Sequence, residues 1–272
     1  MRAGPALYLH VASLEARKAM SYRADFWINV VVSFFAQLGV VWYLWTAIFR
    51  TTGQATIGGW DLPGMLQYYI LVILVGKLVR GQEMMAGVSQ DIYDGGLSRY
   101  LLYPVSYWSF KYAQHLGALL PALVQLVIFL ALLPLMPGGV GAFHPGPGQL
   151  AMAALAMGAG NLLYYLIQLP LQSVAFWADN VWSLSVLLRF VSGLLGGSLL
   201  PLDLFPPGAR ELLGWLPFRY LFDFPVAALL GRLSTGQWAL GMAVSLAWCG
   251  MFWLLAKGVW RRGEVGYTGV GI

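Results

Sequence analysis

Few residues of this 272-residue chain have types and spacings that could catalyse a reaction or bind a metal ion. The one cysteine is Cys249, and the three histidines, His10, His115 and His144, are too scattered for a metal site. No G-x-x-x-x-G-K-[ST] phosphate-binding loop occurs, and the nearest fragment, at residues 75–78, lacks the first glycine and the hydroxyl residue. The H-E-x-x-H and G-x-S-x-G sequences and paired carboxylates inside an apolar segment are also missing. We therefore expect no catalytic residue, metal site or cofactor in this chain.

The charged residue Arg189 lies well inside an apolar segment. It is about eight residues into residues 181–200, or roughly 12 Å along a helix. A buried arginine is costly and usually faces protein or water. Arg189 could line a path for an anionic substrate or lipid headgroup. It could instead pair with Asp179 or Glu83 or reach the cytoplasmic headgroups, and the sequence leaves these roles open.

The elements that must hold Arg189 are predicted membrane spans. Residues 26–48 carry no formal charge, and a helix of about 23 residues can cross a hydrocarbon core of about 30 Å. Hydrophobic residues make up 59% of the chain and charged residues 10%, whereas soluble domains are about a quarter charged. The pattern predicts an all-α polytopic membrane protein with six transmembrane helices, the other five at residues 65–79, 107–135, 150–176, 181–200 and 237–259.

Polar residues at the ends of spans and within them predict anchors and helix contacts. The second helix is expected to continue beyond the membrane, with Lys77, Arg80 and Glu83 as interface anchors. Amides inside spans are expected to hydrogen-bond between helices: Gln114, Gln125, Asn161, Gln168 and Gln172.

The cations predict the orientation. Eleven lie on the side of the N-terminus and four on the other, so the positive-inside bias favours cytoplasmic N- and C-termini. The net charge of +5 does not indicate a nucleic-acid partner, because the cations gather at the ends of apolar segments. Residues 26–48 are too long for a signal-peptide core, so the N-terminal segment is expected to stay on the mature protein.

Residues 1–25 are predicted to form a cytoplasmic N-terminal interfacial helix. Leu7, Val11 and Leu14 recur at helical spacing, with Lys18 at the end of the stripe. A cytoplasmic cap packed on the rest of the protein fits this pattern equally well.

Two further stretches have sequence patterns that are more distinctive than those of the spans. At residues 89–104, two glycines break a helix, Leu97, Leu101 and Leu102 form a short apolar face, and Pro104 fixes the exit. Such a short cytoplasmic helix suits docking into a partner, although an ordinary interfacial loop has the same pattern. Residues 201–225 are too apolar for a solvated loop and too rich in proline for a span, which predicts short external helices at or in the outer leaflet.

The sequences of these two stretches resemble those of the permease subunits of type-2 ABC exporters. The first reads I-Y-D-G-G-L-S-R-Y-L-L-Y-P, and the second P-L-D-L-F-P … L-P-F-R-Y-L … P. The chain is most similar to a formerly uncharacterised branch, in which a separate ATPase pairs with one or two permease chains. The resemblance covers essentially all of the chain.

The resemblance implies one permease domain, residues 1–272, in a bacterial plasma (inner) membrane and in contact with its lipid. A second permease chain, identical or paralogous, would complete the substrate path. An ABC ATPase dimer carrying ATP and Mg²⁺ would drive export. Residues 201–225 would form the external re-entrant helices. Residues 89–104 would form the coupling helix, with coupling residues Asp91, Ile92, Tyr93, Asp94, Gly95, Gly96, Leu97 and Leu101.

Other functions remain open from the residues alone. An ion-coupled secondary transporter would need a carboxylate or histidine at mid-depth, and the nearest candidate, His115, is close to the cytoplasmic end of its span. A non-enzymatic membrane scaffold subunit is a further alternative. An integral-membrane enzyme is disfavoured by the missing catalytic sequences.

Overall fold

The computed structural model describes residues 5–21, 23–81, 86–103, 105–135 and 143–268. Within these residues the chain forms helices and no strand, as expected of apolar segments that must satisfy their own backbone groups in lipid. The α-helices are α1 (Pro5–Ser21), α2 (Arg23–Thr52), α3 (Leu62–Arg80), α4 (Ala86–Tyr93), α5 (Leu97–Leu101), α6 (Tyr107–Ala118), α7 (Leu120–Leu132), α8 (Pro147–Gln172), α9 (Trp182–Leu195), α10 (Pro207–Trp215), α11 (Asp223–Leu229) and α12 (Thr235–Gly266). Short 3₁₀ turns join them at η1 (Leu133–Leu135), η2 (Ser173–Phe176), η3 (Leu202–Leu204) and η4 (Pro217–Leu221).

Five helical stretches of the described chain are long and apolar enough to cross a membrane. They are Val32–Thr52, Leu62–Arg80, Tyr107–Leu135, Pro147–Phe176 and Thr235–Gly266, so the prediction of an all-α polytopic membrane protein is confirmed. The predicted span at 181–200 is shorter than expected. Helix α9 has 14 residues, or about 21 Å, and ends where Gly197 turns the chain at φ +92°.

Helix α3 also ends early. It was predicted to continue past Lys77 and Arg80, but it stops at Arg80 because Gly81 adopts φ +66° and leaves the helical path. Glu83, the third predicted anchor, lies outside the described residues. The carbonyl groups at the end of α3 are bonded by Asn161 of α8, whose Nδ2 donates to the oxygens of Leu78 at 2.8 Å and Val79 at 3.3 Å.

The polar residues predicted within the spans do bond between helices. Lys77 donates to Gln125 of α7, Gln172 donates to Ser185 of α9, and Asn161 bonds to α3 as described. Gln168 instead donates to Tyr164 within α8. The predicted hydrogen bonds between helices are therefore confirmed for the side-chain amides of Gln125, Asn161 and Gln172, but not for that of Gln168.

Helix α1 packs on α6. Val11 is buried, Gln114 donates to Glu15 at 3.2 Å, and Gly117 lies directly against the backbone of Ala12. The protein therefore covers one face of α1, as in the cap interpretation. Leu14, from the predicted apolar stripe, stays exposed, and contact of α1 with lipid remains a prediction.

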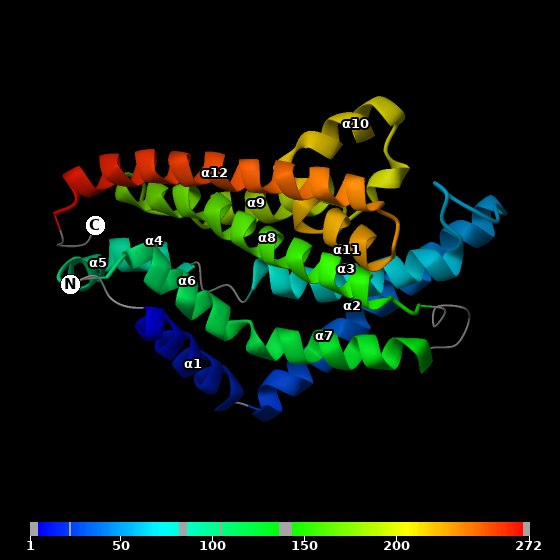
Figure 1. Cartoon of the computed structure of the whole chain (residues 1–272), viewed down its shortest axis with the longest axis horizontal. Coiled ribbons are helices and arrows are strands. Elements are labelled where there is room, and N and C mark those ends of the chain that lie inside the picture. The colour runs from blue at the N-terminus through cyan, green and yellow to red at the C-terminus, as the bar shows by residue number, and fades with distance from the viewer. Residues whose placement is uncertain (1–4, 22, 82–85, 104, 136–142, 269–272) are drawn as a thin grey trace.

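Figure 1 shows where the chain ends lie. The start of α1 and the end of α12 are at the end of the molecule that also holds α4 and α5, on the left. The connection from α2 to α3 and the start of α8 lie at the opposite end. This arrangement agrees with an even number of crossings between the two chain ends.

Close packing of α8 generates the first prediction. A β-carbon at Gly160 would lie 2.8 Å from the carbonyl oxygen of Tyr220, whereas one at Gly158 would meet open space. Gly160→Ala should destabilise the chain by about 1–3 kcal/mol through overpacking against backbone. Gly158→Ala, on the same helix, should be neutral. Thermal unfolding of the purified variants in detergent checks this, and equal melting temperatures would contradict the packing described.

Candidate functional site

Helices α4 and α5 meet at the glycine-rich turn expected from the sequence. Gly95 adopts φ +70°, and the amides of Ser98 and Arg99 donate to the carbonyls of Gly95 and Gly96 at 3.2 Å as α5 begins. We call residues 86–103 the α4–α5 segment. It lies at the left end of the molecule in Figure 1.

The apolar face predicted for this segment is divided between core and surface. Leu97 has 0% of its surface exposed and Ile92 has 1%, because both side chains pack into the hydrophobic core. Leu97 therefore has no surface with which to contact a partner, and its expected place on a docking face is wrong. The exposed apolar side chains of the segment are Leu102, at 85%, and Tyr103. The side chain of Leu101 lies outside the description.

Asp91 joins α4 to α6. Its Oδ2 lies 2.6 Å from Nζ of Lys111 and accepts a 2.7 Å hydrogen bond from the hydroxyl of Tyr107. The side chains of Asp91 and Lys111 are mostly buried, so each charge depends on the other. Tyr107 also stacks on Trp260 of α12, with ring centroids 5.2 Å apart. The α4–α5 segment is thus tied to the ends of two long helices.

Of the other predicted coupling residues, Asp94 is exposed and accepts a 2.7 Å hydrogen bond from Gln90. Tyr93 lines the cavity described next, and burial raises the pKa of its hydroxyl. Sequence reasoning did not assign Lys111 or Tyr107 to this site, because a pairing across a helix break leaves no periodic signal.

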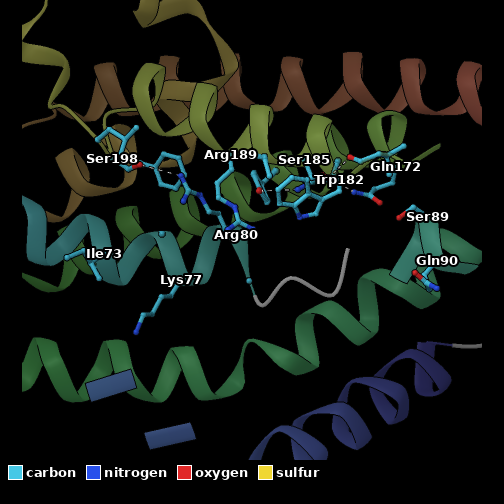
Figure 2. A pocket seen from close by; sticks show the side chains of 18 of the residues that line it. Ile73, Lys77, Arg80, Ser89, Gln90, Gln172, Trp182, Ser185, Arg189 and Ser198 are labelled. Carbon is cyan, nitrogen blue, oxygen red and sulfur yellow. Dashed lines mark hydrogen bonds between the residues drawn. The ribbon is translucent and has the colours of Figure 1, made fainter. Parts of the chain in front are cut away.

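A cavity of about 580 Å³ opens where α3 stops, between α3, α4, α8 and α9. We call it the α3–α9 cavity, and Figure 2 shows its lining. Arg189 lines it, together with Lys77 and Arg80. Among the lining residues that the structure describes there is no carboxylate. The polar lining consists of Gln37, Ser89, Gln90, Gln168, Gln172, Asn180, Ser185 and Ser198, with Tyr93 and Tyr164.

The three cations do not point the same way. Figure 2 shows Arg80 and Arg189 extending toward each other from α3 and α9, while Lys77 points away. The guanidinium of Arg80 lies over the ring of Phe222, 4.6 Å from its centroid, and its Nη2 is 3.4 Å from Oγ of Ser198. Arg80 therefore turns into the protein rather than anchoring at the interface as predicted.

The segment before α12 forms the short helices predicted at 201–225, namely η3, α10, η4 and the start of α11. Asp203 accepts from the indole of Trp60 at 3.1 Å and pairs with Arg210 at 3.2 Å and Arg232 at 3.5 Å. Burial raises the pKa of the Asp223 carboxyl, which nevertheless pairs with Arg219 at 3.1 Å. These contacts fix the segment to the α2–α3 connection. Its position relative to a lipid leaflet remains a prediction.

The comparison with protein families decides what class of protein carries these features. A family model described as ABC-2 family transporter protein matches residues 35–271. The chain belongs to the ABC-2 transporter family. No curated protein matches it. An ABC-2 permease is a multi-pass membrane component that is in general non-catalytic, and membership implies association with an ABC ATPase. Among the described residues, no group of three His, Cys, Asp or Glu side chains could hold a metal ion.

The pairing of Asp91 with Lys111 generates the second prediction. Asp91→Asn should destabilise this ABC-2 permease by about 1–3 kcal/mol, because Lys111 is left mostly buried without a counter-charge. Lys111→Met in the same chain should recover part of that loss. Thermal unfolding of the single and double variants gives a double-mutant cycle. Strictly additive effects would mean that the two side chains do not interact.

Proposed function

We propose that this chain is the transmembrane permease subunit of an ABC exporter. A second permease chain, identical or paralogous, would complete the substrate path, and a separate cytoplasmic ABC ATPase dimer would drive it. The family match over residues 35–271 carries this proposal. ATP and Mg²⁺ would act on the ATPase. Under this proposal, residues 1–272 form one permease domain.

The α4–α5 segment is the proposed docking site for the ATPase. Its exposed Leu102 and Tyr103 offer apolar surface, and its Asp91 links it to Lys111 and Tyr107 of α6. Leu102 and Tyr103 are placed to contact a partner. The ion pair between Asp91 and Lys111 would then transmit a movement of that partner to α6. Leu97 and Ile92 would support the segment from inside.

The proposed topology has six crossings, with α9 as the short fifth crossing. Both termini would lie in the cytoplasm of a bacterial cell, at its inner membrane. This topology is supported by Figure 1, in which the start of α1, helices α4 and α5 and the last turn of α12 lie at the same end of the molecule. The helices before α12 would then form the external re-entrant segment.

The docking proposal is tested at the exposed tip. Leu102→Asp and Tyr103→Ser should each reduce recovery of the ABC ATPase with the affinity-tagged chain by about 30-fold, the effect of losing an interface hot spot of about 2 kcal/mol. Leu212→Asp, at an exposed leucine of α10, is the matched control and should leave recovery unchanged. Mass spectrometry of the complex purified from native membranes measures the ratio. Undiminished recovery of the ATPase with both Leu102→Asp and Tyr103→Ser would contradict the proposed docking site.

The topology is tested by single cysteines introduced into a chain whose buried Cys249 is replaced by Ala. A membrane-impermeant maleimide should label Gly148→Cys in intact cells, because that position is exposed and proposed to be external. Val265→Cys, near the end of α12, should react only after permeabilisation. Labelling of Val265→Cys in intact cells would refute cytoplasmic termini.

A further inference from the structure

We propose that a pocket between α10 and α12 binds a zwitterionic phosphodiester headgroup, with its phosphate on Arg219 and its ammonium group between Glu211 and Trp215. We call it the α10–α12 pocket, and Figure 1 shows α10 beside the first part of α12. Its volume of about 740 Å³ lies within the usual range of small-molecule sites, about 300–1,000 Å³. The proposal goes beyond the permease function and does not depend on it, because it uses only this pocket and the length of α12.

The first argument is the balance of charge on the pocket wall. The described lining carries both charges in equal number, namely the carboxylates of Asp203, Glu211 and Asp223 and the guanidinium groups of Arg210, Arg219 and Arg232. Asp203 is shared by Arg210 and Arg232, whereas Glu211 has no ion pair in the part of the chain that the structure describes. One positive and one negative charge are therefore in excess at different places. A zwitterion complements both without adding net charge to the pocket.

The second argument is that Arg219 is fixed and still has donors for a phosphate. Its Nε donates to Oδ2 of Asp223 at 3.1 Å, which uses one of its five N–H donors. A guanidinium can donate two parallel hydrogen bonds to a phosphate, and the two Nη groups suit that role. A β-carbon at Gly214 would lie 3.4 Å from Nη1 of Arg219, so the missing side chain lets the guanidinium lie against α10.

The third argument is that carboxylate and aromatic ring lie together beside that guanidinium. Glu211 and Trp215 are four residues apart on α10, so they share one face, and Gly214 lies on the same face. Both side chains line the pocket, and the ring of Trp215 is 61% exposed. The backbone oxygen of Trp215 accepts a 2.8 Å hydrogen bond from the indole of Trp248 on α12, which holds this turn in place. An ammonium group is attracted by a carboxylate and by the face of an indole ring.

The fourth argument is the depth of the pocket along α12. Its α12 lining begins at Gln237, which is 20 residues, or about 30 Å, from Lys257 near the opposite end. That distance equals the thickness of the hydrocarbon core. With Lys257 at one boundary of the core, Gln237 lies at the other, where the headgroup and acyl chains of a phospholipid join. Exposed Leu240, also on the wall, offers apolar surface for an acyl chain.

The headgroup could come from a membrane lipid or from its deacylated, soluble form. The probes are phosphatidylethanolamine, phosphatidylglycerol as the lipid without an ammonium group, and glycerophosphoethanolamine. Each is titrated against the purified full chain in detergent while the melting temperature is followed, because a ligand that binds only the folded state raises it. Phosphatidylethanolamine should raise it more than phosphatidylglycerol. An effect of phosphatidylethanolamine alone identifies a lipid ligand, and an equal effect of glycerophosphoethanolamine shows that the headgroup suffices.

The variants locate the site. Glu211→Gln, at an exposed position, should weaken the apparent affinity for phosphatidylethanolamine at least tenfold and leave that for phosphatidylglycerol unchanged. Glu264→Gln, at an exposed acid near the other end of α12, is the matched control and should bind as the wild type does. Arg219→Lys keeps a charge beside Asp223 but loses the planar pair of donors, so it should weaken the binding of both lipids.

Two results would overturn the proposal. One is equal protection of the wild-type chain by phosphatidylglycerol and phosphatidylethanolamine, or no protection by either ethanolamine probe. The other is an affinity for phosphatidylethanolamine that is the same in Glu211→Gln as in Glu264→Gln. Because Glu211 is exposed and makes no ion pair with the described residues, its variant is expected to fold, and it decides the outcome even if Arg219→Lys does not fold.

Discussion

Helix α3 stops inside the protein, and the backbone groups at its end have to be satisfied there. Asn161 does this from α8, and it also accepts a hydrogen bond from Tyr112 and lies 2.8 Å from Nε2 of His115. One buried amide therefore joins α3, α6 and α8. The α3–α9 cavity opens beside this end of α3, and Arg80 and Gly81 both line it.

The same constraint appears at the end of α9. The chain turns at Gly196 and Gly197, where irregular backbone in an apolar setting needs partners. The hydroxyl of Tyr68 donates to the carbonyl of Gly197 at 2.8 Å, and that of Tyr69 donates to Leu199 at 3.1 Å. Two adjacent tyrosines of α3 thus stabilise the interruption. Both broken helices are satisfied by side chains of a neighbouring helix, which makes the two interruptions parts of one packed unit.

The sequence predicts those features that follow from composition and from local breakers. Hydropathy locates the long helices, prolines indicate the short external ones, and Gly95 marks the turn between α4 and α5. The end of α3 escapes prediction because a lone glycine such as Gly81 is tolerated in an apolar helix. Periodicity places Leu97 on an apolar face, but it cannot tell whether the core or a partner covers that face. Arg189 was predicted as a possible cavity residue, whereas Arg80 joins it only through tertiary packing.

The stacking of Tyr107 on Trp260 would let α12 act as a lever if the α4–α5 segment moves with a docked ATPase, as proposed. Helix α12 has 32 residues and is therefore about 48 Å long. Near its end it packs closely on Phe176 through Gly263, and near its start it packs on the ring of Phe224 through Gly241. A tilt of about 5° imposed at the α4–α5 end would shift the far end by about 4 Å, given that length. The distance between the two ends would thus amplify a small displacement at the base into a rearrangement of α11 and the helices beside it.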